Sequence, residues 1–224
     1  MRTPMNEGAD LPIPPDAATL TAALASDALD RLGRRNRCLG WDLVPLDPTS
    51  RIVGRAFPVT VEAVDRVPDV PYRGLLASLE GLGEGDVYVI PTRRSDRAAV
   101  WGELVSTAAR ARGAVGALTD GLVRDTAMVR SMGFPVIARG SIPSDTNGRL
   151  ETIALAEAGV IDGVTITRGD LIVADGDGVV VIPADLVGEV VSLVQEKVRG
   201  EAAFRAAVAA GELPTVAFER YRVL

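Results

Sequence analysis

The chain has 224 residues, of which 47% are hydrophobic, and a formal net charge of −6. This length fits one large domain with a substantial core. The acidic balance argues against nucleic acid as a primary partner, because phosphate binding usually requires a basic patch. The nearest approach to such a patch is Arg31, Arg34, Arg35 and Arg37, which we interpret as a solvated helix end. No apolar run reaches the roughly 18–20 residues of a membrane span, and residues 1–7 lack the apolar stretch of a secretory signal. We therefore expect a cytoplasmic protein without a membrane partner.

The residue types that are missing narrow the chemistry further. The chain has no histidine, which excludes Ser-His-Asp and Cys-His catalysis and any metal held by imidazole. A single cysteine, Cys38, excludes an internal disulfide and a multi-cysteine metal site. The only lysine, Lys197, lies in a polar helix end, which is unsuited to a Schiff base. Carboxylates, arginines, hydroxyls, backbone amides and a hard metal ion remain.

The first third of the chain predicts an arm, a helix and a strand. Residues 1–15 hold four prolines and little pattern, so we expect a flexible arm followed by one domain over residues 16–224. The apolar spacing over residues 16–32 predicts a helix, with Gly33 as its stop. Residues 51–64 alternate and are rich in branched side chains, which predicts a strand.

The middle of the chain alternates between strands and helices. Strands are expected at residues 86–90, 98–101, 114–118 and 134–138, with helices at 103–112 and 126–132. This alternation predicts parallel crossovers. Beyond residue 140 we expect mainly strands, including a hairpin of residues 171–174 and 179–182, and then two helices at 184–199 and 201–210. The fold class is therefore α/β, with helices at both ends.

The segment Gly102-Glu103-Leu104-Val105 lies at an expected strand-to-helix junction. Unpaired amides and the positive dipole end of such a helix can bind a carboxylate or an enolate, and glycine lets a ligand approach the backbone. The alternative is an ordinary turn in which Glu103 merely favours the first helical turn.

The segment Asp120-Gly121-Leu122-Val123-Arg124-Asp125 follows an expected strand, and ligands gather at the carboxyl ends of such strands. Arg124 can bind a carboxylate through two parallel hydrogen bonds. Asp125 can offer an oxygen to Mg²⁺ or Mn²⁺. The alternative is that Asp125 caps the helix starting at Thr126 and that Arg124 pairs with a surface acid.

A third acidic segment contains Asp170, Asp175 and Asp177. Three carboxylates within eight residues raise the possibility of calcium, but their spacing does not match the EF-hand loop, so a tight turn is favoured.

Several segments together resemble the RraA-like family, which contains 4-hydroxy-4-methyl-2-oxoglutarate aldolases and the regulator of ribonuclease E activity A. The resemblance covers roughly residues 20–211. It rests on Gly102-Glu103-Leu104, Asp120-Gly121-x-x-Arg124-Asp125, Gly133-Phe134-Pro135-Val136, and the run from Gly169-Asp170 to Ile182-Pro183. The chain departs from the aldolases at residues 70–75, where they tend to carry an Asp-Asn pair.

The resemblance implies a swivelling β/β/α domain that assembles as a homotrimer or hexamer with active sites between subunits. In that family Arg124 would bind the 2-oxo acid, Asp125 would hold the metal and Glu103 would order its water. The amides of Gly102, Glu103, Leu104 and Val105 would bind the pyruvyl end, and Arg149 falls where aldolases contact substrate through a lysine. A glutamate from the neighbouring subunit's C-terminal helix would complete the site. Glu201 is the best match, judged by its distance from Gly211.

The expected function is a divalent-metal-dependent class II pyruvate aldolase that cleaves 4-hydroxy-2-oxo acids and decarboxylates oxaloacetate. The alternative is a non-catalytic regulator that binds a protein such as a ribonuclease. Methyl transfer to a quinone lacks support, because no cofactor-type Gly-x-Gly loop follows a first strand.

Overall fold

The computed structural model describes residues 13–223, so most of the expected arm, residues 1–12, lies outside the described residues. The helix expected over residues 16–32 is in fact two elements, a 3₁₀ helix η1 (Pro15–Thr19) and α1 (Ala22–Arg31). The break occurs because Leu20 is extended and the Thr21 hydroxyl accepts a hydrogen bond from the Leu24 amide, which starts a new helix. Gly33 follows α1 with a φ of 72°, as expected for a helix stop.

The main sheet is mixed and is built around the long strand β2 (Ile52–Ala63). Its strand order is β1-β7-β5-β3-β2-β12-β13, and β9 pairs with the second half of β2. The parallel part confirms the expected crossovers, since β3, β5 and β7 run parallel to one another. The other strands of this sheet are β1 (Val44–Pro45), β3 (Asp86–Ile90), β5 (Gly116–Thr119), β7 (Val136–Ala138), β9 (Leu150–Leu155), β12 (Leu171–Asp175) and β13 (Gly178–Ile182).

The hairpin of β12 and β13 confirms the tight turn that was favoured over a calcium site. Asp175 pairs in register with Gly178. Its carboxylate accepts hydrogen bonds from the Asp177 amide at 3.0 Å and from the Ala22 amide at 2.9 Å. Asp175 therefore stabilises the turn and the start of α1.

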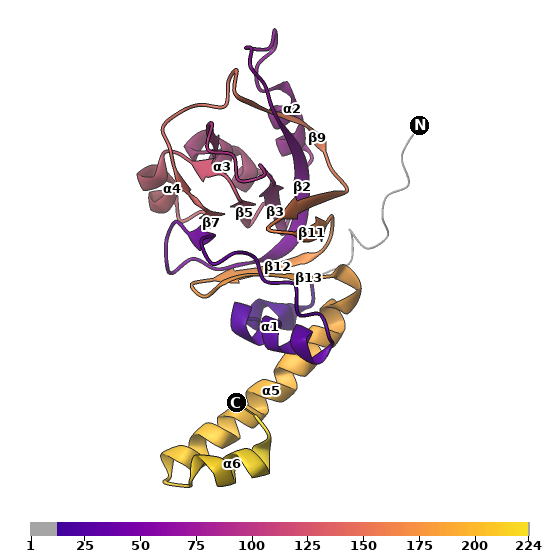
Figure 1. The fold of residues 1–224 in the computed structure, drawn as a ribbon, viewed down its shortest axis with the longest axis vertical. Helices are drawn as coiled ribbons and strands as arrows, with labels where there is room; N and C mark the ends of the chain where they lie inside the picture. Colours follow the sequence, from indigo (N-terminus) through magenta and orange to yellow (C-terminus); the bar gives the residue numbers. More distant parts are fainter. Residues whose placement is uncertain (1–12, 224) are drawn as a thin grey trace.

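Two smaller sheets complete the body. One is a hairpin of β10 (Ala158–Ile161) and β11 (Val164–Thr167). The other contains three short parallel strands, β4 (Ala99–Trp101), β6 (Leu122–Val123) and β8 (Gly140–Ser141). The helices of the body are α2 (Arg73–Glu80), α3 (Glu103–Ala111) and α4 (Thr126–Met132). Figure 1 shows α3 and α4 beside the ends of the parallel strands.

The aromatic part of the core includes Trp101, the last residue of β4. The ring of Trp101 is 5.3 Å from Tyr88 and 6.0 Å from Phe134, measured between ring centroids. Its indole N–H donates to the Ser106 hydroxyl at 2.7 Å. Trp101 is fully buried, so these contacts fix the position of the residue that precedes Gly102 and α3.

The C-terminal helices differ from the sequence prediction. The two helices expected at residues 184–199 and 201–210 form one continuous helix, α5 (Val187–Ala209), after the short 3₁₀ turn η2 (Ala184–Leu186). Gly200 lies inside α5, where a single glycine costs only about 1 kcal/mol relative to alanine. A Cβ at Gly200 would lie 2.8 Å from Cγ1 of Val223, so glycine allows the chain end to pack against α5.

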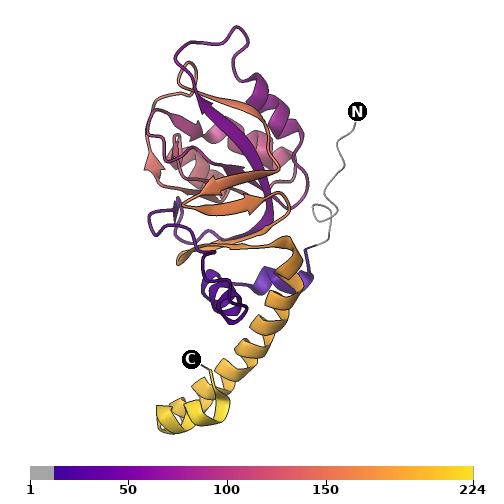
Figure 2. The same ribbon diagram turned by 45° about the vertical axis from the view of Figure 1, so that its right-hand side comes forward.

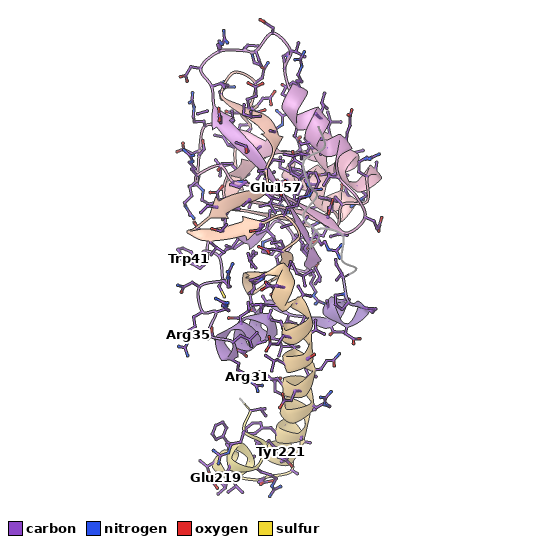
Figure 3. The ribbon with its side chains drawn as sticks, turned by 90° about the vertical axis from the view of Figure 1, so that its right-hand side faces the viewer. Arg31, Arg35, Trp41, Glu157, Glu219 and Tyr221 are labelled. Carbon is purple, nitrogen blue, oxygen red and sulfur yellow. The ribbon has the colours of Figure 1, made fainter. Side chains whose placement is uncertain are left out.

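The last helix, α6 (Pro214–Tyr221), was not predicted. Figure 2 shows α5 leaving the body and α6 folding back beside its far end. In Figure 3 the side chains of Arg31, Arg35 and Trp41 reach outward. Arg31, Arg34 and Arg35 are exposed as predicted, whereas Arg37 is half-buried and its guanidinium donates to the Thr165 carbonyl at 3.5 Å. Within the described residues, no helix combines the length and hydropathy needed to cross a membrane.

Candidate active site

The candidate site lies at the carboxyl ends of the three short parallel strands. β4 leads into Gly102 and α3, β6 into Arg124 and α4, and β8 into Ile142. A hollow of about 300 Å³ opens there, lined by Val123, Arg124, Asp125, Thr126, Ser141, Ile142 and Pro143. Parallel strand ends are the usual place for ligands in α/β proteins.

The Asp125 carboxylate is available for ligand chemistry. Asp125 occupies the position before α4 in a left-handed conformation, φ 54° and ψ 33°, and its side chain makes no capping hydrogen bond. The alternative in which Asp125 caps this helix is therefore wrong. Its Oδ2 atom instead faces the start of α3, 3.4 Å from the Glu103 amide, and its side chain is 41% exposed.

Gly102 allows this arrangement because it has no side chain. A Cβ there would lie 2.8 Å from Oδ2 of Asp125 and 3.1 Å from Cγ of Arg124. Its φ of −167° is extended backbone that any residue adopts, so the requirement is for space. The sequence predicts that Gly102 lets a ligand approach the backbone. In the structure, the groups that lie closest to Gly102 are the side chains of Arg124 and Asp125.

The guanidinium of Arg124 lies between two carboxylates. Its Nε atom is 3.7 Å from Oδ2 of Asp125, and its Nη1 atom is 3.7 Å from Oδ1 of Asp145. Both separations are those of ion pairs rather than hydrogen bonds, so they leave the planar group able to bind a ligand carboxylate. The Arg124 backbone amide donates to the Trp101 carbonyl at 2.9 Å, which ties the two strand ends together.

Asp145 was not among the candidate residues, although it is part of the site. Its Oδ2 atom accepts a hydrogen bond from the Tyr72 hydroxyl at 2.5 Å, and its Oδ1 atom accepts one from the Thr146 amide at 2.6 Å. Burial alone would raise the pKa of Asp145, but these donors and the charge of Arg124 hold this pKa below its ordinary value. No local sequence motif could have indicated this role.

Most of the remaining predicted site residues lie near Arg124 and Asp125. Glu103 begins α3, and its carboxylate accepts a hydrogen bond from the Thr107 hydroxyl at 3.1 Å. Arg149 is exposed and donates to the Asp145 carbonyl at 3.0 Å, which places it beside the site. Leu104 and Val105 follow in the first turn of α3.

Glu201 is separate from this group within one chain. It lies on α5, 3.5 Å from Lys197 and 3.8 Å from Arg205, measured between charged atoms. Figure 1 shows α5 on the far side of the body from α3 and α4.

Asp120, the first residue of the motif that ends in Arg124 and Asp125, has a structural role. It is 1% exposed, and its carboxylate accepts hydrogen bonds from the amides of Thr92 at 2.6 Å and Arg94 at 3.0 Å. The strand expected at residues 114–118 is β5, which ends at Thr119, just before Asp120. Arg124 follows a second, shorter strand, β6.

The donor set fits a hard metal ion that keeps most of its water. Residues 13–223 contain no group of three or more His, Cys, Asp or Glu side chains arranged to hold a metal. Asp125 offers one exposed carboxylate without a capping role. Mg²⁺ is commonly bound through one or two carboxylates and several waters, so this chemistry suits Mg²⁺ or Mn²⁺ better than a metal that needs a full protein cage.

The fold and the site define an α/β protein with an arginine and a carboxylate at parallel strand ends. A family model described as "RraA-like: Aldolase/RraA" matches residues 21–181. The chain therefore belongs to the RraA-like family, and the expected swivelling β/β/α class with helices at both ends is confirmed.

Three relatives illustrate the range of this family. A Halalkalibacterium halodurans protein named "Putative 4-hydroxy-4-methyl-2-oxoglutarate aldolase" is 32% identical over 166 residues, 74% of this chain and 73% of that protein. Protein DlpA of Legionella pneumophila is 30% identical over 89% of this chain, but the match spans only 32% of DlpA. The crystal structure of Streptomyces coelicolor RraAS2, described as an unusual member of the RNase ES inhibitor RraA protein family, has a TM-score of 0.78 and 28% identity, covering 85% of this chain and 95% of that one.

Proposed function

We propose that the protein is a divalent-metal-dependent pyruvate aldolase that cleaves 4-hydroxy-2-oxo acids such as 4-hydroxy-4-methyl-2-oxoglutarate and decarboxylates oxaloacetate. The observation that carries this proposal is the convergence of Arg124 and Asp125 on one hollow at the strand ends. The relatives named as aldolases support the same class of reaction.

The chemistry requires stabilisation of one negative charge. Cleavage of the bond between C3 and C4 of the substrate sends its electron pair into the 2-oxo group and leaves the enolate of pyruvate. The leaving fragment is CO₂ from oxaloacetate, or a carbonyl compound formed when the 4-hydroxyl loses its proton. Both reactions therefore need the same stabilised enolate, which is why we propose both activities for one site.

Arg124 would bind the substrate carboxylate through its planar N–H groups and orient the 2-oxo group toward Asp125 and the start of α3. The amides of Gly102 to Val105 and the helix dipole favour developing negative charge at that position. A divalent ion held by Asp125 and water would supply Lewis-acid stabilisation of the enolate. Because the chain has no histidine, the proton would move through a carboxylate or metal-bound water, and Glu103 at the start of α3 would order that water.

A homotrimer or hexamer would bring a second chain to the site. Glu201 lies on α5, which extends away from the body within one chain (Figure 2). A glutamate on this helix could therefore act only at the site of a neighbouring chain, as the family resemblance implies.

Incubation of the purified protein with oxaloacetate, with and without Mg²⁺ or Mn²⁺, tests this function by the pyruvate formed. Asp125→Ala should abolish metal-dependent turnover, and Arg124→Ala should reduce it severely while the protein stays folded. Exposed residues of the same types on and after α1 offer matched controls, Asp30→Ala and Arg34→Ala, which should keep wild-type rates.

A second candidate function is a non-catalytic regulator that binds a protein such as a ribonuclease. The similarity to Streptomyces coelicolor RraAS2 favours it. Absence of turnover on oxaloacetate and on 4-hydroxy-2-oxo acids, together with tight metal-independent binding to a protein, would support the regulator and reject the aldolase.

A further inference from the structure

Tyr72 reaches the candidate site from a different part of the chain. It is the residue before α2, and its backbone is left-handed, with φ 62°. Such a conformation is rare and costly for a bulky side chain and persists where the surrounding structure enforces it. Its hydroxyl donates to Oδ2 of Asp145 at 2.5 Å.

Asp145 is held firmly on its other sides. Its backbone forms a parallel bridge with Ala99 of β4, and the Ala99 amide donates to the Ser144 carbonyl at 2.9 Å. Its Oδ1 atom is fixed by the amide of Thr146. The strand that leads to Gly102 therefore also anchors Asp145.

The contact between Tyr72 and Asp145 keeps a negative charge beside Arg124. Donation to Asp145 raises the pKa of the Tyr72 phenol, because the proton is shared with a carboxylate. The pKa of Asp145 is lowered despite its partial burial. Its ionised Oδ1 atom lies 3.7 Å from Nη1 of Arg124.

We propose that Tyr72 is a positioning residue that acts through Asp145 to hold the Arg124 guanidinium in the orientation that binds the substrate carboxylate. This inference rests on the proposed function. Tyr72 touches Asp145 and does not line the hollow that Arg124 and Asp125 share.

The substitution Tyr72→Phe removes only the hydroxyl, and Tyr221→Phe on α6 is the matched control. In Tyr72→Phe we expect KM for oxaloacetate to rise about fivefold to tenfold with kcat within about twofold, since the lost interaction acts on substrate binding. Melting temperatures of both variants should match the wild type within a few degrees. In an Asp145→Asn background, Tyr72→Phe should have no further effect on KM, because the two residues act as one unit.

Two measurements independent of turnover complete the test. The affinity for oxalate, a stable enolate analogue, measured by calorimetry without metal, should fall in Tyr72→Phe by the same factor as KM rises. The phenolate titration of Tyr72, isolated as the ultraviolet difference between wild type and Tyr72→Phe, should shift to lower pH in Asp145→Asn.

The outcomes separate the inference from the proposed function. Normal wild-type turnover with an unchanged KM in Tyr72→Phe overturns the inference alone. An additive effect of Tyr72→Phe in the Asp145→Asn background, or an unshifted phenol titration, also overturns it. A wild-type protein that neither binds oxalate nor turns over any 2-oxo acid rejects the proposed function, and the inference falls with it.

Discussion

The substitution Gly102→Ala tests the geometry of the site without removing any of its charged groups. The added methyl group would lie 2.8 Å from Oδ2 of Asp125 and 3.1 Å from Cγ of Arg124, closer than a Cβ tolerates. Both contacts are with partly exposed side chains that can rotate away, so the backbone need not move. Gly102 occupies the N-cap position of α3, and substitutions at helix N-caps typically change stability by about 0.5–1 kcal/mol, so we expect a loss of that size.

The effect on activity should be much larger than the effect on stability. A displacement of about 1 Å in a catalytic group can reduce the rate by about 100-fold, which corresponds to about 2.7 kcal/mol in the barrier. We predict this loss in kcat/KM of Gly102→Ala, measured as pyruvate formed from oxaloacetate at saturating Mg²⁺. Gly188→Ala is the control, because a Cβ at Gly188 meets nothing within 4 Å. If Gly102→Ala keeps wild-type kcat/KM and metal dependence, the close approach of Asp125 to α3 does not matter for catalysis.

Three further predictions concern the surroundings of the site. The pKa of Asp145 is lowered in the folded protein, so its ionised carboxylate stabilises the fold fully above the ordinary aspartate pKa of about 3.9. This stabilisation is lost as the pH falls through the lowered pKa. The loss of unfolding free energy caused by Asp145→Asn, measured in urea, should therefore become smaller below about pH 4. If Glu201 completes the site of a neighbouring chain, Arg124→Ala and Glu201→Ala chains should each be inactive alone. When equal amounts are mixed and reassembled, about one quarter of the intersubunit sites should contain both intact residues and regain activity. No recovery of activity would place Glu201 outside the site. Trp101→Phe removes the hydrogen bond to Ser106 and leaves a cavity, so the free energy of unfolding should fall by about 2–4 kcal/mol in chemical denaturation.

The sequence was most informative where local signals act alone. The helix expected at residues 126–132 is α4 with the same bounds, because Gly133 adopts the left-handed conformation that ends it, with φ 62°. The alternation of strands and helices predicted the parallel order of β3, β5 and β7. Periodicity and stop signals were sufficient for these elements.

The sequence was least informative where strands are too short to have a period. β6 and β8 have two residues each, so neither their existence nor the pairing of β6 with β4 and of β8 with β6 could be predicted. Asp145 enters the site through an isolated bridge to Ala99 of β4, which no local pattern of the sequence indicates. The site was therefore predicted as separate motifs on the chain, and the acidic residue that completes the surroundings of Arg124 was missed.

The conformation of Asp125 connects the local structure to the proposed chemistry. An aspartate before a helix normally stabilises it by capping, which contributes about 1 kcal/mol, and a left-handed backbone is uncommon for non-glycine residues, although Asp adopts it more readily than most. Asp125 forgoes the cap and adopts that backbone, with φ 54°. The backbone is held on both sides of Asp125: the Trp101 carbonyl accepts a hydrogen bond from the Arg124 amide at 2.9 Å, and the Asp125 carbonyl accepts one from the Val129 amide at 3.0 Å. In this conformation the Asp125 carboxylate faces the start of α3, 3.4 Å from the Glu103 amide, and lines the hollow in which we propose that a metal ion binds.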